Sequence, residues 1–544
     1  MIFMNKLIAF LSTKQASLLI IIISIISRII NVLFVSYYGR DKMYLILQSK
    51  SLLEGKGLAV PQYLTTDPAV PIYDFTPLWP PGYPILLAPF LKVFNYNIYW
   101  ATTTVDIIFC IALLFIVRKI CRQIGLSTAA TNIMTIIAGC FEYTFINESL
   151  PTDLVSIVLS LLSINFLINL AASNEFSIKK IVLVSFLAFL PCLFRYNYPA
   201  ISLALISGLF FIGFMKRNAL LKKKSLFLFV FTGLLTASFF ILMKSLTGHA
   251  GYAAPTARGF YPENIVHWFP VVPSAFINIA FLTSQAIHLA NIPFNTSMQL
   301  LEVINVIAII VLLVILLNAL LRRKFLEEIT PVKIFLIAGS FASIGLFVLL
   351  GYMSLTYAVQ KGYANNWNYV YEPRYFAFTV LFLQIAFIAW FFQLKNSIRN
   401  LFVKVLASVC FFALFIEITH NLYFHTKVAL RFKEYKSNVY REQDYAYHIS
   451  LMKDIKLKYP EHQVWAAAPG DNFYQYLATY HGYIGIADAN SFKNADIKVK
   501  SKTILILMVY DHEIPNFDHF LKTSKILQTD RKLNSNFYLI ELIP

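Results

Sequence analysis

The stretch Gly39-Arg40-Asp41-Lys42-Met43-Tyr44, followed by Trp79-Pro80-Pro81-Gly82-Tyr83-Pro84, decides the fold of this chain. It comes directly after the first long apolar segment, so the carboxylate of Asp41 is held where a membrane meets water. A charge in that place is costly, which makes Asp41 a candidate functional residue. The alternative is that Asp41 only caps the N-terminus of a surface helix over residues 42–53.

The proline run that closes this stretch restricts the backbone. Each proline removes a backbone donor and restricts the residue before it, so the run is expected to stay outside any regular helix. We predict a rigid elbow on the membrane surface, with Trp79 and Tyr83 as interface anchors.

Composition places the chain among polytopic membrane proteins. Hydrophobic residues make up 58% of the 544 positions and charged residues 14%, which excludes a water-soluble globule. The net charge of +18 resides largely in short basic loops between apolar segments, so we predict membrane lipids and no nucleic acid as partners. The five cysteines lie in or beside apolar segments and predict no disulfide framework.

About eleven apolar runs are long enough to span a bilayer. They lie near residues 15–37, 98–117, 128–146, 152–172, 179–194, 199–215, 225–246, 299–321, 334–356, 375–394 and 402–423. Basic residues cluster in alternate loops, which by the positive-inside rule places the N-terminus inside the cell. Residues after 424 and the long loops 38–97 and 247–298 are then extracytoplasmic, and these loops are the expected place for chemistry.

Two domains are predicted: a transmembrane domain over residues 1–424 and a soluble domain over 425–544. In the second, apolar runs at 463–468, 504–510 and 537–543 predict buried strands, and 440–459, 472–480 and 517–523 predict helices. Strands that alternate with helices indicate a small α/β domain. Within the first domain, loop 247–298 is expected to act as a mobile cover over a site.

Three acidic residues at predicted outer helix ends are the catalytic candidates: Asp41, Glu148 and Asp153. A carboxylate beside a hydroxyl-bearing substrate can act as a general base, and two together could hold a divalent cation. For Glu148 and Asp153 the alternative is a helix N-terminus, where negative charge is favourable.

Four basic residues stand at helix boundaries on the side disfavoured for positive charge: Arg195, Arg258, Lys361 and Arg374. Guanidinium groups match phosphate oxygens in pairs, so we predict that these residues bind a lipid phosphate. For Arg374 the alternative is an ion pair with Glu372 or a lipid headgroup contact. No histidine or cysteine spacing typical of a metal site is present.

Together these residues resemble the bacterial GT-C glycosyltransferases, in particular the protein-mannosyltransferase and aminoarabinose-transferase type. The resemblance rests on Asp41 just after the first membrane helix, Tyr44, the run Leu52-Leu53-Glu54-Gly55-Lys56-Gly57-Leu58 and the proline run 79–84. It continues with Glu148, the Arg195-Tyr196 turn and Arg374-Tyr375, over roughly residues 10–395.

This resemblance implies an enzyme of the bacterial inner membrane that moves a sugar from a polyprenyl-phosphate donor to a glycan, lipid or protein acceptor at the outer face. Asp41 would be the catalytic acidic residue. The aromatic residues Tyr44, Trp79, Tyr83 and Tyr196 are expected to form the substrate loop. Many relatives carry two adjacent acids where this chain has Asp41-Lys42, which leaves open whether Mg²⁺ or Mn²⁺ takes part.

Two other functions fit a polytopic chain with few intramembrane charges. A flippase or transporter for lipid-linked sugars should show broken, charged helices at mid-membrane in two related halves. An outer-face polysaccharide polymerase would usually lack the proline elbow so soon after the first helix.

Overall fold

The computed structural model of the chain describes residues 2–35, 39–64, 70–74, 79–141, 151–248, 259–262, 269–321, 328, 330–356, 373–394, 401–431, 440–468, 472–486, 492, 499–532 and 535–544. Contacts divide the chain into two compact units. The membrane unit comprises Met1–Leu33, Pro77–Pro80 and Asp106–Leu430, and the loop–tail unit comprises Phe34–Thr76, Pro81–Val105 and Arg431–Pro544.

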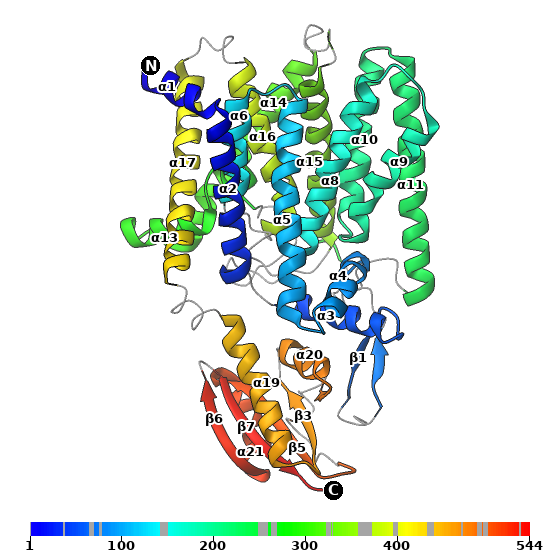
Figure 1. Cartoon of the computed structure of the whole chain (residues 1–544), viewed down its shortest axis with the longest axis vertical. Helices are drawn as coiled ribbons and strands as arrows, with labels where there is room; N and C mark the ends of the chain where they lie inside the picture. The colour runs from blue at the N-terminus through cyan, green and yellow to red at the C-terminus, as the bar shows by residue number, and fades with distance from the viewer. Residues whose placement is uncertain are drawn as a thin grey trace. The chain divides into compact units, whose positions relative to one another are not determined.

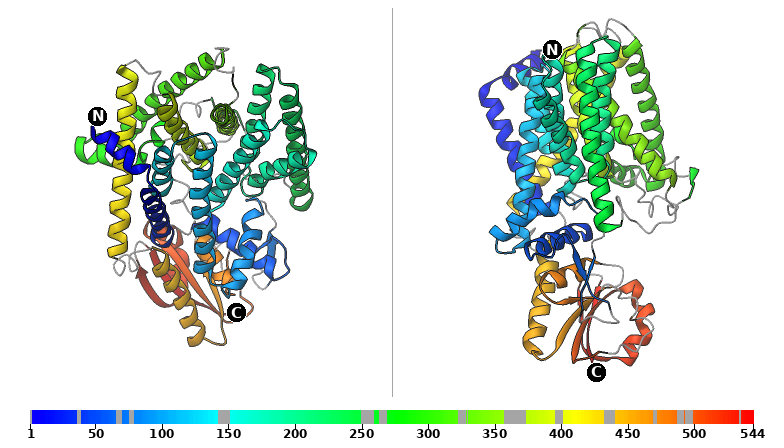
Figure 2. Two further views of the ribbon diagram at one scale, coloured as in Figure 1. Left: turned by 45° about the horizontal axis from the view of Figure 1, so that its top comes forward. Right: turned by 90° about the vertical axis from the view of Figure 1, so that its right-hand side faces the viewer.

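The membrane unit is a bundle of long helices (Figures 1 and 2). In the described part of the chain, nine helices are long and apolar enough to cross a membrane. They are α2 (Lys14–Ile30), α5 (Ile98–Gln123), α8 (Pro151–Ala172), α10 (Tyr198–Met215), α11 (Ala219–Thr247), α14 (Phe294–Leu321), α15 (Pro331–Thr356), α16 (Ala377–Leu394) and α17 (Leu401–Leu430). Shorter helices are α1 (Ile2–Leu11), α12 (Val271–Ser274) and α13 (Ile279–Ala290).

Two of the eleven predicted spans are shorter helices in the described residues. The first, α6 (Thr128–Cys140), has 13 residues. The carbonyls of Ala138 in its last turn and of Phe141, its C-cap, accept hydrogen bonds from Arg28 of α2. The second, α9 (Ile178–Phe189), passes into the 3₁₀ segment η2 (Leu190–Leu193). Pro191 lies in η2, and a proline there cannot donate the backbone bond that would continue an α-helix.

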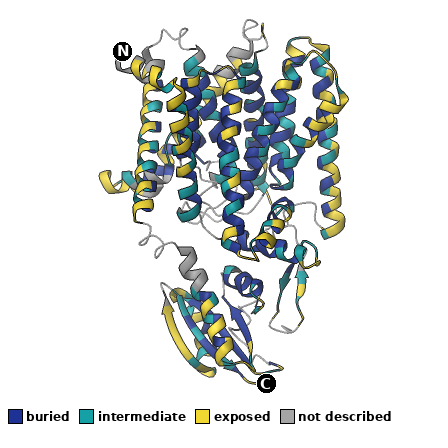
Figure 3. Cartoon of the chain, in the orientation of Figure 1, coloured by how far each residue is buried: buried dark blue, intermediate teal, exposed yellow. Residues whose placement is uncertain are grey.

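Close packing of small residues joins the central helices. A Cβ on Gly208 of α10 would lie 2.8 Å from the Cα of Ala338 of α15, and one on Gly345 would lie 2.7 Å from the Cβ of Ala204. Such small residues let membrane helices approach closely. Helices at the margin expose apolar residues, such as Leu234 and Ile241 of α11 at 59% and 69% (Figure 3), as a lipid-facing surface allows.

The tail forms the predicted α/β domain. Its sheet has the order β4-β3-β5-β7-β6, with β3 (Gln463–Ala467) parallel to β4 (Ile484–Gly485) and β5 (Thr503–Tyr510), and with β7 (Ser535–Leu542) antiparallel to β5 and β6 (Lys525–Lys532). The helices are α19 (Tyr440–Lys458), α20 (Asn472–Tyr480) and α21 (Ile514–Thr523). The sequence predicted β3, β5 and β7 but missed the two edge strands. The two residues of β4 are too few to form a pattern, and β6 consists mostly of polar residues and lacks an apolar run.

The first loop is more ordered than the sequence predicted. It contains α3 (Arg40–Leu53), the antiparallel pair β1 (Val60–Gln62) and β2 (Ile72–Asp74), and α4 (Gly82–Val93). The helix α3 is no surface helix, since every residue from Lys42 to Ser49 is buried. Asp41 is not its N-cap either, because Gly39 occupies that position.

The proline run also departs from the expectation. Gly82-Tyr83-Pro84 form the first turn of α4, where backbone N–H groups have no partner within the helix and a proline is tolerated. Tyr83 is fully buried, so the prediction that it anchors an interface is wrong.

Candidate functional site

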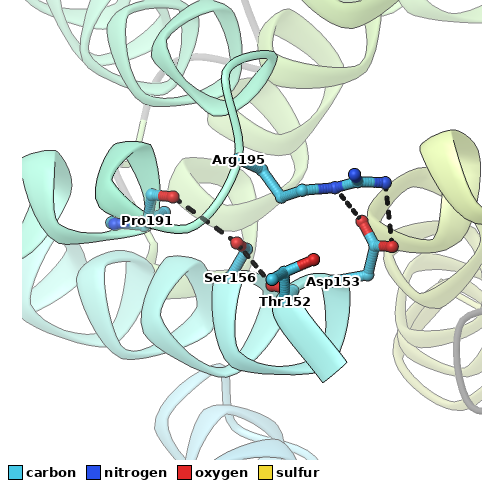
Figure 4. Close-up of polar contacts among 5 residues, drawn as sticks. All are labelled: Thr152, Asp153, Ser156, Pro191 and Arg195. Carbon is cyan, nitrogen blue, oxygen red and sulfur yellow. Dashed lines mark hydrogen bonds and ion pairs between the residues drawn. The ribbon is translucent and has the colours of Figure 1, made fainter. Parts of the chain in front are cut away.

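The candidate site of the membrane unit is built around an ion pair between Asp153 and Arg195 (Figure 4). Nε of Arg195 donates to Oδ1 of Asp153 at 2.5 Å, and Nη2 donates to Oδ2 at 2.9 Å. Both side chains are 1% exposed. This is the paired geometry in which a guanidinium and a carboxylate bind most strongly.

Local structure places the two partners. Asp153 lies in the first turn of α8, where the helix dipole favours its charge. Arg195 follows η2, and its backbone N–H donates to the carbonyl of Pro191 at 3.1 Å. The hydroxyl of Ser156 donates to the carbonyls of Thr152 and Pro191 at 2.8 and 3.4 Å, and so ties α8 to the turn that carries Arg195 (Figure 4).

Two aromatic rings flank the guanidinium of Arg195. Its Cζ lies 4.8 Å from the ring centroid of Trp79 and 5.1 Å from that of Tyr375. Arg374, in η5 (Pro373–Phe376), lies 5.8 and 5.5 Å from the same two rings. The membrane unit thus brings together Trp79 of the first loop, Arg195 and Arg374, three residues that the sequence singled out.

One nitrogen of this arginine is distinct from the other two. Nη1 of Arg195 is buried and has no hydrogen-bond partner among the described residues. A buried donor left unpaired costs roughly 1–3 kcal/mol. Since Asp153 neutralises Arg195, the added charge of Arg374 leaves these three ionised side chains with one net positive charge. The arrangement suits an anionic ligand.

The sequence indicated Tyr375 only as part of the resemblance, without a role in the site, and it missed Ser156. It also missed that Asp153 and Arg195 are partners. Both residues were placed at outer helix ends, but their contact joins positions 42 residues apart, and no local pattern specifies such a contact.

The other first-loop candidates, Asp41, Tyr44 and Tyr83, lie in the loop–tail unit. Asp41 is the second residue of α3 and is partly exposed. Tyr44 is 1% exposed and packs edge-on against Tyr476 of α20, with centroids 5.8 Å apart. Tyr44 and Tyr83, both predicted to belong to the substrate loop, are therefore buried packing residues here.

Tyr196 lies beside the ion pair in sequence, but its ring points into an aromatic cluster. It packs against Phe239 and Phe240 of α11, with centroids 6.5 and 6.1 Å away. Its hydroxyl is buried without a partner among the described residues. Glu148, Arg258 and Lys361, and most of the cover loop that includes Arg258, lie outside the described residues.

The described residues do not fit a divalent cation. Among them, no group of three His, Cys, Asp or Glu residues is placed to hold one. Both oxygens of Asp153 already accept bonds from Arg195, which removes the acidic ligand that this part of the site would offer.

Comparisons with known proteins give a fold but no close relative. No family model matches the sequence, and no curated protein matches it. The crystal structure of ArnT from Cupriavidus metallidurans in the apo state matches with a TM-score of 0.52 and 11% identity, over 96% of this chain and 97% of that one. The same protein bound to undecaprenyl phosphate matches with a TM-score of 0.45 and 12% identity, over 97% and 98%.

The archaeal oligosaccharyltransferase AglB from Archaeoglobus fulgidus, in complex with an inhibitory peptide and a dolichol-phosphate, also matches. Its TM-score is 0.47 at 13% identity, over 96% of this chain and 74% of that chain. These matched proteins are GT-C membrane glycosyltransferases. The nine long apolar helices and the five-stranded sheet of the tail make the described chain a polytopic membrane protein with a small C-terminal α/β domain. More specifically, its fold is similar to that of ArnT from Cupriavidus metallidurans, in agreement with the GT-C-like fold that the resemblance predicted.

Proposed function

We propose that this chain is a membrane glycosyltransferase that moves a sugar from a polyprenyl-phosphate donor to a hydroxyl-bearing glycan, lipid or protein acceptor. The observation that carries the proposal is Arg195, a buried guanidinium held from one side by Asp153 and flanked by two rings, within a chain of GT-C fold. A fixed guanidinium with one nitrogen unbound is suited to stabilise the departing phosphate.

The reaction needs few groups. The acceptor hydroxyl loses its proton to the carboxylate of Asp41, and its oxygen forms the new bond to the anomeric carbon. The bond from that carbon to the phosphate oxygen breaks, and the electron pair leaves with the polyprenyl phosphate. Arg195 and Arg374 stabilise the charge that develops on this leaving group, so that positioning and electrostatics supply most of the rate.

Asp153 takes a different role from the one its place in the sequence indicated. A carboxylate that accepts two charge-assisted bonds is a weak base. We therefore assign Asp153 to holding Arg195 in place, and leave Asp41 as the base. On the positive-inside argument, the reaction takes place at the outer face of the bacterial inner membrane.

The test replaces Asp41 by asparagine, which keeps the shape but cannot take the proton. Purified protein in liposomes is supplied with a panel of radiolabelled polyprenyl-phosphate sugars and with cell-envelope acceptors, and release of polyprenyl phosphate is measured. We expect Asp41→Asn to lower turnover by at least about 10²-fold. The matched control is Asp518→Asn in α21, a 55% exposed carboxylate, which should stay active. Normal turnover in Asp41→Asn would remove Asp41 from the mechanism.

A further inference from the structure

Apart from Trp79 and Pro80, which belong to the membrane unit, the described part of the first loop belongs to the same compact unit as the C-terminal domain. Within that unit α3 packs against α4 on one side and α20 on another (Figures 1 and 2). Because residues 42–49 of α3 are all buried, the helix has no free face along this length. The helix that carries Asp41 is therefore held by packing.

Tyr480, the last residue of α20, contacts two parts of the first loop. Its carbonyl accepts a hydrogen bond from Nζ of Lys50 at 2.6 Å, and the same ammonium lies 5.1 Å from the centroid of its ring. Its hydroxyl donates to the carbonyl of Tyr96, just after α4, at 2.9 Å. One residue, through its backbone carbonyl and its side chain, thus links the end of α3 and the segment after α4 to the C-terminal domain.

A backbone contact joins the β1–β2 pair to the sheet of the tail. Tyr63, directly after β1, forms a parallel bridge with Ile486, directly after β4. Ile486 is 1% exposed, and Tyr63 packs against the apolar core on that side of the sheet. The first loop therefore contributes a residue to a domain core that lies more than 400 residues further along the chain.

We propose that the C-terminal domain holds the catalytic helix α3 in position, with Lys50 and Tyr480 as positioning residues for Asp41. This rests on the proposed function, in which Asp41 is the base. A general base must lie within hydrogen-bond reach of its proton, and a displacement of about 1 Å can cost roughly 10²-fold in rate. The long first loop meets this demand by packing α3 between α4 and α20.

The first experiment removes the ammonium of Lys50. Lys50→Met keeps most of the stem but loses the bond to Tyr480, the ring contact and an ion pair with Glu54 on the same helix turn at 3.6 Å, and we expect turnover to fall by roughly 10- to 100-fold. Donor KM should stay unchanged, since Lys50 is not proposed to touch the donor. Lys50→Arg should retain most activity. The matched control is Lys522→Met in α21, which removes the same charge from a side chain that is 73% exposed.

The second experiment replaces the lost contact by a covalent one. Bridge partners have Cα atoms close enough for a disulfide, so Tyr63→Cys with Ile486→Cys should cross-link under mild oxidation. We expect the cross-linked protein to stay active, and the cross-link to restore turnover to Lys50→Met. Turnover of this variant should fall when the disulfide is reduced and recover when it is reoxidised, which would show that the cross-link itself restores activity.

Three results would overturn the proposal: unchanged turnover in Lys50→Met, failure of the cysteine pair to cross-link, or a cross-linked protein that is inactive and recovers on reduction. The last would mean that the loop must leave the domain during turnover. If the wild-type chain transfers no sugar from any donor, the proposed function fails. The cross-linking yield does not depend on activity, so it would then still show whether the first loop packs on the C-terminal domain.

Discussion

Removing the Asp153–Arg195 pair one partner at a time and then together separates its structural from its functional contribution. Either Asp153→Asn or Arg195→Met leaves one buried charge without its partner. Since both side chains are 1% exposed, we expect each single variant to be destabilised by about 3–5 kcal/mol. The double variant removes both charges, and replacing a buried ion pair by neutral groups is often close to neutral, so it should be more stable than either single variant.

Activity should not follow stability across these three variants. All three variants lose the held guanidinium, and losing one such preorganised donor costs about 10²–10³-fold in turnover. We therefore expect the double variant to be stable and inactive. Stability is measured as the thermal unfolding midpoint in detergent, and activity as release of polyprenyl phosphate.

The exposed pair Asp518–Lys522 in α21 is the control for this cycle. Its side chains are 55% and 73% exposed, and Asp518→Asn with Lys522→Met should change stability by less than about 1 kcal/mol. If Arg195→Met alone were as stable as the wild type, the energetic argument would be refuted. If the double variant kept its turnover, Arg195 would have no role in the reaction.

Three further predictions follow from single features. Arg374→Lys should lower turnover more than it raises donor KM, because an ammonium cannot reproduce the paired geometry of a guanidinium as charge develops; a change in KM alone would indicate binding only. In a Cys410→Ser background, a cysteine at Lys522 should react with an impermeant thiol reagent in cells with a permeabilised outer membrane, and one at the exposed Ala219 should not; the reverse would invert the topology. Burial, with Lys50 and Lys453 nearby, lowers the pKa of His481 from 6.5 to about 4, so the unfolded chain binds a proton between these values that the folded one does not. Stability of the C-terminal domain should therefore fall as pH drops from about 6.5 to 4, by at most about 3 kcal/mol; the same pH dependence in His481→Gln would show that another group is responsible.

The sequence alone determined the class of the protein and most of its elements. Long apolar runs have no stable alternative to membrane helices, which is why nine of the predicted spans appear as long helices in the described residues. The strands β3, β5 and β7 were predictable because a buried strand is apolar whatever lies next to it. Asp41 and Trp79 stood out because a charge and a proline run are unusual beside a membrane helix.

Only the tertiary structure decided which of these residues meet. The sequence predicted separate roles for Asp153 and Arg195. Their contact at 2.5 and 2.9 Å makes Asp153 the ion-pair partner that holds the guanidinium of Arg195. Likewise, the sequence placed Tyr44 and Lys50 in an outer loop. In the structure both contact α20 of the C-terminal domain. Helices and strands are set by periodicity over a few neighbouring residues. Contacts between residues far apart in the chain depend on how whole elements pack, and no local pattern encodes them.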